Sequence, residues 1–282
     1  MNVDSFFATG KTHTVCQDYT RHGIAEDGTP YAILSDGCST APDSDIGARL
    51  LVRAAEFDLK RNFPLEARVV IARAWAYASA LGMNPRCLDA TLLAIWVQDG
   101  MIRTQMYGDG YVAGRRRDGS FLIWKGDFPS GAPYYLNYLM DRKRRDQYLR
   151  EFDGGKHILT IFDGRHNKWF GPCADDQSSW ELLQGDSGKF NPAEFDMVAV
   201  FSDGAGTFVH APDNGAPEAL PVEGIITRTF DISPPTGVFM ARSGKWLVAK
   251  WCPANAMFHN DDFSVAALNI GALPEPLAKE AL

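Results

Sequence analysis

Four aspartates share a context that could do chemistry. Each follows an apolar run or stands beside a glycine: Ala32-Ile33-Leu34-Ser35-Asp36-Gly37, Met106-Tyr107-Gly108-Asp109-Gly110, Val198-Ala199-Val200-Phe201-Ser202-Asp203-Gly204 and His259-Asn260-Asp261-Asp262-Phe263-Ser264-Val265. A strand delivers the side chain at its end with little freedom, and a following glycine lets the backbone turn sharply and leaves its carbonyl accessible. Several such carboxylates, brought together by folding, make an oxygen-rich site for hard divalent cations. The pattern therefore indicates metal-assisted chemistry.

Crowded carboxylates repel one another unless a cation neutralises them. A pair of divalent ions that share a bridging carboxylate is a recurrent device for hydrolysing phosphate esters, because a water held between them becomes the nucleophile. An all-oxygen ligand set favours Mg²⁺ or Mn²⁺ over zinc. Most Asp-Gly pairs are simple turns, and we interpret Asp99-Gly100 and Asp118-Gly119 in that way. Asp36 and Asp203 differ from these because an apolar strand directly precedes each.

Helices and short strands surround these aspartates. Apolar spacing predicts helices over 45–60, with Ser44 as N-cap, over 65–81 and over 238–250. Strands are predicted at 31–36, 90–97, 101–107, 111–117, 120–124, 157–162, 197–202 and 263–270, several of them joined by Asp-Gly turns. Strands and helices come in runs, which favours an α+β fold with antiparallel sheets. The segment 127–191 is less regular and holds Arg142-Lys143-Arg144-Arg145, a run typical of a solvated helix face.

Composition excludes several other classes of protein. The chain has 282 residues, of which 45% are hydrophobic and 22% charged, and its net charge is −7. A mildly acidic chain has no general attraction for nucleic acid or for an anionic membrane. The five cysteines form no C-x-x-C pair, so neither a disulfide framework nor a structural zinc site is indicated. The N-terminus lacks the order of a signal peptide, and we expect a cytoplasmic protein.

The motifs resemble, in sequence order, those of the metal-dependent protein phosphatases (the PPM or type 2C family), and most closely a bacterial subgroup. They are Cys16-Gln17-Asp18, Ser35-Asp36-Gly37 before the 45–60 helix, Asp89-Ala90-Thr91 with the hairpin ending in Gly108-Asp109-Gly110, Ser202-Asp203-Gly204, and Asp261-Asp262-Phe263-Ser264-Val265. The resemblance implies a four-layer αββα sandwich of two antiparallel sheets flanked by helices. It also implies a single domain over 1–282, with an irregular or flap-like insertion at about 127–191.

The resemblance also implies the site. Asp36 would bridge two Mn²⁺ or Mg²⁺ ions, and the Gly37 carbonyl would bind one of them. Asp203 and Asp261 would complete the other ion, Asp109 would bind an optional third, and Asp18 would hold the water. The implied activity is hydrolysis of phosphoserine or phosphothreonine on a protein substrate. We expect a monomer that, as its composition indicates, binds neither nucleic acid nor membrane.

The chain departs from the family pattern at the position of the phosphate-clamping arginine, where it has His13. We expect His13 to be catalytic by binding the substrate phosphate, although it lacks the two-pronged fork of arginine; Lys11 or the Arg142–Arg145 run are alternatives. Gln17 stands where Glu is frequent, and Cys38 where some members have a general-acid histidine. These departures leave open a pseudophosphatase that binds a phosphoprotein without turnover. A hydrolase acting on a small phosphate ester is a third possibility.

Overall fold

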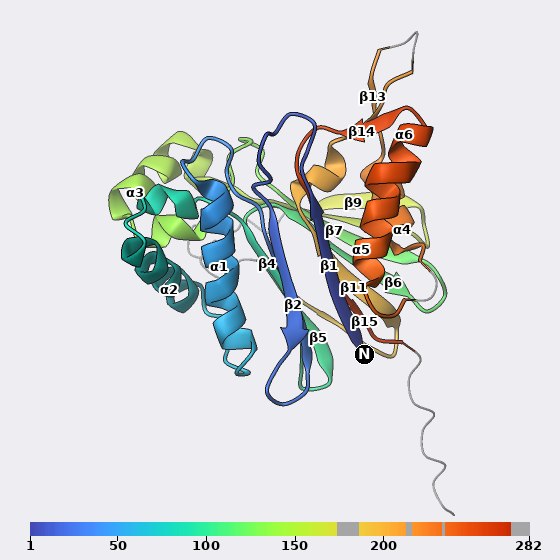
Figure 1. The fold of residues 1–282 in the computed structure, drawn as a ribbon, viewed down its shortest axis with the longest axis horizontal. Coiled ribbons are helices and arrows are strands. Elements are labelled where there is room, and N and C mark those ends of the chain that lie inside the picture. The colour runs from blue at the N-terminus through green and yellow to red at the C-terminus, as the bar shows by residue number, and fades with distance from the viewer. Residues whose placement is uncertain (174–185, 213–215, 233–234, 272–282) are drawn as a thin grey trace, which may run out of the picture.

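Two antiparallel sheets pack face to face in the middle of the structure, and helices cover the outer face of each (Figure 1). The computed structural model describes residues 1–173, 186–212, 216–232 and 235–271. The larger sheet has seven strands in the spatial order β1 (Asn2–Ala8), β15 (Phe263–Asn269), β11 (Phe195–Phe201), β6 (Gly110–Arg116), β7 (Phe121–Asp127), β8 (Ile158–Asp163) and β9 (Lys168–Cys173). The smaller sheet has five, in the order β10 (Asp186–Phe190), β5 (Met101–Tyr107), β4 (Leu92–Gln98), β3 (Pro30–Ser35) and β2 (Tyr19–Ile24). A small third sheet contains β13 (Glu218–Ala219), β12 (Phe208–His210) and β14 (Met257–His259).

The helices form the two outer layers. The layer on the smaller sheet contains α1 (Ser44–Leu59) and α2 (Ala67–Ala80), with α3 (Arg142–Glu151) beside them. The layer on the larger sheet contains α4 (Val222–Phe230) and α5 (Phe239–Trp246), which continues through a π-helical turn (Leu247–Trp251) into α6 (Cys252–Ala254). Short 3₁₀ turns occupy Pro85–Leu88 (η1), Leu136–Leu139 (η2), Asp153–Gly155 (η3) and Asp203–Gly206 (η5).

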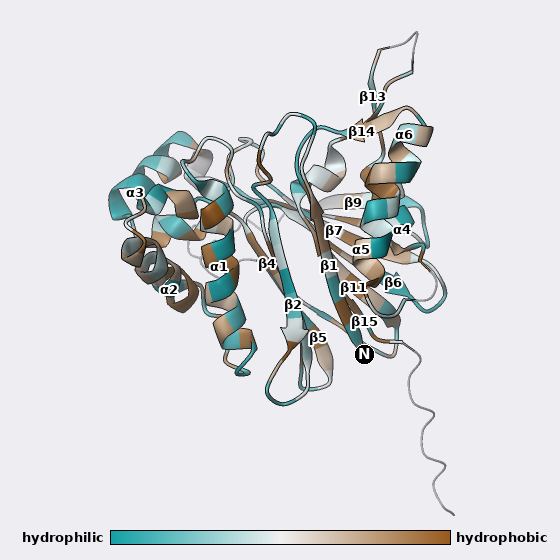
Figure 2. Ribbon diagram, viewed as in Figure 1, coloured by the Kyte–Doolittle hydropathy of each residue, from teal (hydrophilic) through white to brown (hydrophobic). Residues whose placement is uncertain are grey.

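Side-chain alternation along the central strands builds three layers of core. On β3, Ala32 and Leu34 point between the sheets, whereas Tyr31 and Ile33 point toward the helices. β15 does the same on the other side of the sandwich, because alternate residues of a strand face opposite ways. A strand covered on both faces has no polar side, so β3 and β15 are buried along their whole length. Figure 2 shows brown, hydrophobic residues along inner strands such as β4 and β15, and a mixture of teal and brown residues on α1.

The predicted fold class is confirmed, and each predicted helix and strand is present within a few residues of its expected bounds. One local prediction was wrong: Ser44 is the first residue of α1, and Asp43, with φ of 51°, takes the N-cap position without a side-chain hydrogen bond. The sequence prediction missed the N-terminal strands β1 and β2, the edge strands β9 and β10, the small third sheet and helix α4, and it expected α3 only as a helix face at residues 142–145, without bounds.

The segment 127–191 is more regular than its sequence indicated. It contains η2, α3 and η3, then strands β8 and β9 of the larger sheet, and β10 at the edge of the smaller one. Residues 174–185 of this segment lie outside the described residues. Among the residues that the structure describes, no helix combines the length and the apolar content needed to cross a membrane.

Candidate metal centre

A cavity of about 380 Å³ gathers the aspartates from separate parts of the chain. Four aspartates line it: Asp36, Asp109, Asp203 and Asp261. They come from the ends of β3, β5 and β11 and from the turn between β14 and β15. Gly37 and His13 also belong to the lining. Asp18 is buried and does not line the cavity, but its carboxylate is close enough to Asp36 for the two charges to interact. The cavity therefore has the oxygen-rich lining that the sequence predicted.

Backbone contacts hold Asp36 at the end of β3. The Thr91 amide donates to the Asp36 carbonyl over 2.8 Å, and the Asp36 amide donates to Thr91 Oγ1 over 3.1 Å. The next residue must be glycine, because a Cβ at Gly37 would lie 2.7 Å from the Ser44 carbonyl oxygen at the start of α1. The first turn of α1 thus packs directly against the loop that follows Asp36.

Two glycines shape the turn that carries Asp109. Gly108 has φ of 94° and Gly110 has φ of 134°, both in the region that side-chain-bearing residues rarely adopt. A Cβ on Gly110 would also lie 2.7 Å from the Phe201 carbonyl oxygen of β11. The tight β5–β6 turn therefore brings Asp109 beside the strand that ends at Asp203.

Asp203 and Asp261 are placed by a close contact between two turns. Asp203 opens the η5 turn after β11, and a Cβ on Gly204 would lie 1.7 Å from the Asp262 carbonyl oxygen. The Asp261 amide donates to Thr207 Oγ1 over 3.1 Å, which ties the two turns together. These two contacts hold the turn that carries Asp203 against the turn that carries Asp261.

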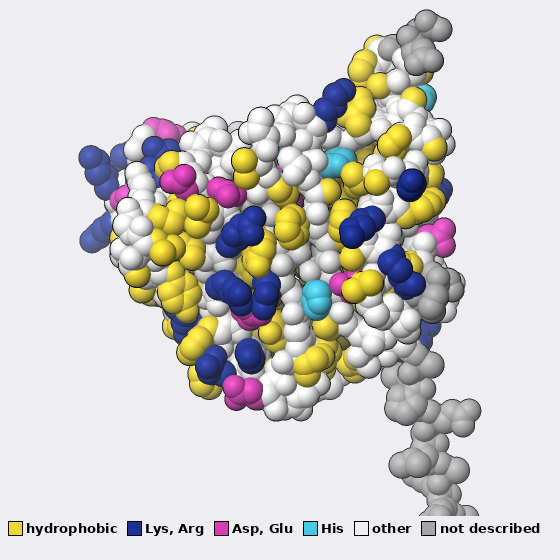
Figure 3. Space-filling view, viewed as in Figure 1, with side chains coloured by type: hydrophobic (Ala, Val, Ile, Leu, Met, Phe, Trp, Pro, Cys, Tyr) yellow, Lys and Arg dark blue, Asp and Glu magenta, His cyan; other side chains and the backbone are white. Residues whose placement is uncertain are grey.

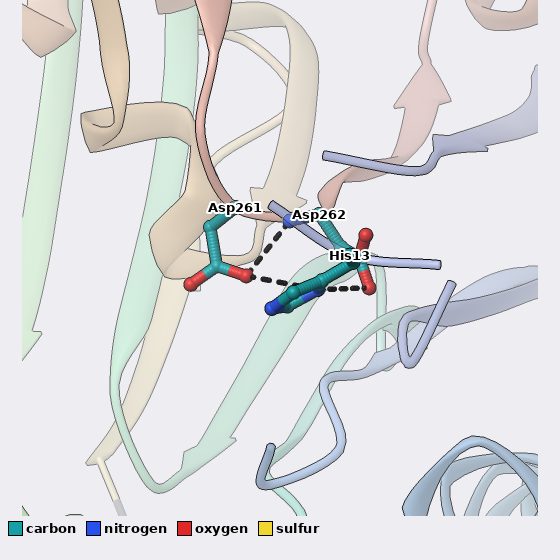
Figure 4. Close-up of side chains that lie close together, drawn as sticks. All are labelled: His13, Asp261 and Asp262. Carbon is teal, nitrogen blue, oxygen red and sulfur yellow. Dashed lines mark hydrogen bonds and ion pairs between the residues drawn. The ribbon is translucent and has the colours of Figure 1, made fainter. Parts of the chain in front are cut away.

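Asp262 organises the N-terminal loop. Its Oδ1 accepts the Gly10 amide over 2.7 Å and its Oδ2 accepts the Gln17 amide over 2.6 Å. His13 Nδ1 lies 3.0 Å from Asp262 Oδ2 and 3.5 Å from Asp261 Oδ1 (Figure 4). Ligand atoms of these three side chains lie within 4.8 Å of one another, a grouping that could hold a metal ion. Asp261 lines the cavity, whereas Asp262 does not and uses both carboxylate oxygens to accept backbone hydrogen bonds.

The electrostatics of the site call for a cation. Burial and the neighbouring carboxylates of Asp18, Asp203 and Asp109 hold the pKa of Asp36 well above its usual range. Burial raises the pKa of Asp18 and of Asp109 to about 7, and it raises the pKa of Asp203 as well. Both Asp18 carboxylate oxygens are buried without a hydrogen-bond partner among the described residues. Such a set of oxygens fits divalent metal ions, which would neutralise the carboxylates.

His13 is the basic group of this lining; no described Lys or Arg belongs to it. Burial alone would lower the pKa of His13, but its hydrogen bond to Asp262 and the charges of Asp262, Asp261 and Asp18 outweigh burial and raise the pKa. The histidine is therefore held as a partner of two aspartates at the rim of the cavity.

An aromatic wall forms part of the lining of the cavity. Pro133, Tyr135, Tyr138 and Phe152 line it, all from the segment between β7 and β8. Tyr138 packs against Tyr148 of α3, with ring centroids 5.0 Å apart. The cavity therefore combines aromatic ring surface with its acidic side chains.

Comparisons with known proteins identify the fold that carries this cavity. Residues 9–128, which include Asp18, Asp36 and Asp109, match the family described as Protein phosphatase 2C. The crystal structure of a bacterial serine phosphatase superimposes with a TM-score of 0.57 and 13% identity, over 97% of this chain and 100% of that chain. This chain has the protein phosphatase 2C fold. The predicted resemblance to bacterial members of the family is confirmed.

Two further structures share the protein phosphatase 2C fold with this chain. The serine/threonine phosphatase Stp1 from Staphylococcus aureus has a TM-score of 0.52 at 12% identity, over 96% of this chain and 95% of that chain. The serine/threonine phosphatase of S. agalactiae has a TM-score of 0.50 at 14% identity, over 94% and 98%. A search of curated proteins finds no match. At these identities the solved structures establish the fold alone.

Within this protein phosphatase 2C fold, the site residues predicted from sequence converge: Asp36, Gly37, Asp109, Asp203, Asp261 and His13 line one cavity, and Asp18 lies behind Asp36. Two alternative phosphate donors do not line it. Lys11 Nζ lies 3.7 Å from the centre of the Phe258 ring, and Arg144 forms an ion pair with Asp89. The interpretation of residues 142–145 as a solvated face was wrong for Arg144, although Arg142 and Lys143 are exposed.

Sequence reasoning missed the wall residues Tyr135, Tyr138 and Phe152. Their only signal was the aromatic-rich stretch that begins at Pro133-Tyr134-Tyr135. That stretch has no helical or strand period, because its residues form loops and a short 3₁₀ turn.

Proposed function

We propose that the chain is a metal-dependent serine/threonine protein phosphatase. The observation that carries the proposal is the convergence of Asp36, Asp109, Asp203 and Asp261 on one cavity whose described lining includes no Lys or Arg to balance them. Carboxylates with raised pKa values need a cation for their ionised form to be stable. Mn²⁺ or Mg²⁺ suits an all-oxygen site.

We assign a role to each residue from its position in the cavity. Asp36 interacts with Asp18, Asp203 and Asp109, and this central position supports its proposed role as a ligand shared by two ions. Asp203 and Asp261 would hold one of these ions and the Gly37 carbonyl the other, with Asp109 at an optional third. When bound, the ions would lower the pKa of a water at the site and polarise the phosphate oxygens. Asp18, behind Asp36, would orient that water.

The phosphorylated side chain would enter between the acidic and aromatic sides of the cavity. Tyr135 and Tyr138 offer apolar ring surface for the peptide next to the phosphoserine or phosphothreonine. His13 would donate to the phosphate from the rim while the carboxylates of Asp261 and Asp262 favour its protonated form. In this mechanism, most of the positive charge that binds the phosphate would come from the metal ions.

Release of phosphate from a phosphothreonine peptide, with and without Mn²⁺, tests the proposal. We expect turnover only with metal, and we expect Asp36→Asn and Asp203→Asn to lower kcat/KM about 100-fold or more, because each removes a charge that holds an ion. Asp99→Asn is a matched control on an exposed turn. Equal turnover by the wild type and both site variants would reject the proposal.

One observation favours a second function, a phosphoprotein-binding module. The described lining lacks the arginine that would clamp a phosphate, and His13 is engaged by two aspartates. A module of this kind would bind the phosphopeptide without releasing phosphate. Binding of the phosphothreonine peptide in the presence of Mn²⁺, without release of phosphate, would support the binding module. Release of phosphate would reject it.

A further inference from the structure

A second cavity, of about 450 Å³, lies along the C-terminal half of α1 and shares no lining residue with the metal centre. Arg21 of β2 and Arg53, Lys60 and Arg61 of α1 and its C-terminus line it. We call it the α1 groove. Figure 3 shows Lys and Arg side chains gathered over α1 and β2 on this face of the molecule. The concentration is unexpected in a chain whose net charge is −7.

The positive charge of the α1 groove is not balanced from within. Four cationic side chains line it against one carboxylate, Glu56. The Glu56 carboxylate already forms ion pairs with the guanidinium groups of Arg21, at 2.9 Å, and Arg53, at 2.7 Å. Within the described part of the chain, Lys60 and Arg61 have no carboxylate at ion-pair distance, and both are exposed. The groove therefore presents a net positive surface to solvent.

Three of the four cationic side chains, those of Arg21, Arg53 and Arg61, have contacts within the chain that hold them in place before any ligand binds. Glu56 is buried, and it orders the guanidinium of Arg21 through two hydrogen bonds of 3.1 and 2.9 Å. The Phe57 ring makes cation–π contacts with the guanidinium groups of Arg61 and Arg73, which lie 3.8 Å and 4.2 Å from the ring centre. Side chains that are already ordered lose less conformational entropy when they bind a partner.

We propose that the α1 groove docks an acidic segment of the phosphoprotein substrate, an inference that rests on the phosphatase function proposed above. Carboxylates of such a segment complement Lys60 and Arg61, and the half-exposed Phe57 and Tyr77 offer apolar contact to its backbone and side chains. Nucleic acid fits less well, because the cationic patch is confined to one groove on an acidic protein.

The course of α1 sets the spacing that a substrate would need. Its first residue, Ser44, packs against Gly37 at the metal centre, and Arg53 to Lys60 lie nine to sixteen residues further on. At about 1.5 Å per helical residue, the groove begins roughly 14 Å and ends roughly 24 Å along the helix from the metal centre. An extended peptide covers that span with about four to eight residues. Acidic residues at this separation from the phosphoresidue would reach the groove.

Binding can be measured apart from catalysis. The probe is a fluorescein-labelled, unphosphorylated peptide with six consecutive glutamates, followed by anisotropy at low salt in the absence of metal. We expect binding by the wild type, at least tenfold weaker binding by the double variant Lys60→Glu/Arg61→Glu, and weakening by added salt. The control Lys245→Glu/Lys250→Glu changes net charge equally on exposed residues of the opposite helical layer and should bind like the wild type.

Turnover provides the second arm. A phosphothreonine peptide with four glutamates placed six residues away should have a higher kcat/KM than its glutamine counterpart, and Lys60→Glu/Arg61→Glu should abolish the difference. Absence of turnover on every peptide would reject the proposed phosphatase function. The anisotropy measurement would then still decide whether the α1 groove binds an acidic peptide. Unchanged binding by Lys60→Glu/Arg61→Glu, or tighter binding of a single-stranded oligonucleotide of equal charge, would overturn the docking proposal.

Discussion

The Arg144 guanidinium donates two parallel hydrogen bonds, of 3.0 and 2.6 Å, to the carboxylate of Asp89. Asp89 is buried, and its backbone carbonyl accepts the amide of Cys38, which lines the metal cavity. Asn137 adds a third contact, donating to Asp89 Oδ1 over 2.7 Å. The aromatic wall and the loop that follows Asp36 are thus anchored to the same residue, the wall through the Asp89 carboxylate and the loop through the Asp89 backbone carbonyl.

Arg144→Lys keeps the charge of this anchor and removes its fork. We expect a loss of about 1–3 kcal/mol in the free energy of unfolding, because a buried carboxylate loses one of its charge-assisted hydrogen bonds. We also expect a higher KM for a phosphopeptide, since the aromatic wall would be less well anchored. Urea unfolding and steady-state kinetics measure both, with the exposed Arg142→Lys on the same helix as control. A variant identical to the wild type in both assays would show that the anchor is not needed.

Asp262→Asn should destabilise the N-terminal loop. Asparagine keeps one acceptor oxygen, so either the Gly10 or the Gln17 amide would face an NH₂ group instead of a carboxylate. An unsatisfied buried amide costs about 1–3 kcal/mol, and the midpoint of urea unfolding should fall accordingly. The control is Asp99→Asn, which changes the same chemical group on the surface. If both variants unfold at the wild-type midpoint, Asp262 does not organise this loop.

The metal-free chain should lose stability as pH rises toward neutrality. In the folded state Asp18 and Asp109 have pKa values of about 7, whereas unfolded aspartates titrate near about 4. Between these values the folded chain binds protons that the unfolded chain has released, so the free energy of unfolding falls with rising pH. We expect the Tm with chelator to drop by several degrees between about pH 5 and pH 8 and Mn²⁺ to restore it at the higher pH.

Asp109→Asn provides the comparison for that pH series. Removing one titrating carboxylate should make the decline of Tm with pH shallower than in the wild type. A metal-free Tm that stays level across the series, or a decline unchanged by Asp109→Asn, would contradict the assigned pKa shifts.

The sequence predicted the parts of the fold whose signal is local. β3 and β15 are covered on both faces, so their apolar runs are unbroken and easily recognised. β1 and β2 were missed because polar residues interrupt their pattern. Asp4 of β1 accepts the Ala241 amide near the start of α5, and Arg21 of β2 pairs with Glu56. These polar residues have partners that are distant in sequence, and no local pattern reveals them.

The same division holds for the site. Asp36 and Asp203 were found because each directly follows a buried strand. The hydrogen bonds that Asp262 accepts join residues 245 and 252 positions apart, and only the folded chain brings them together. Arg144 was misinterpreted for a related reason, since a run of cations in sequence does not show that one of them meets a buried carboxylate.

Calorimetric titration of the metal-free chain with Mn²⁺ tests the central claim most directly, because it needs no substrate. We predict that each wild-type chain binds at least two ions, that Asp36→Asn loses this binding, and that Asp99→Asn keeps it. We also predict that Asp109→Asn still binds two. Absence of Mn²⁺ uptake by the wild type, or uptake by Asp36→Asn equal to that of the wild type, would contradict a metal centre built on these carboxylates.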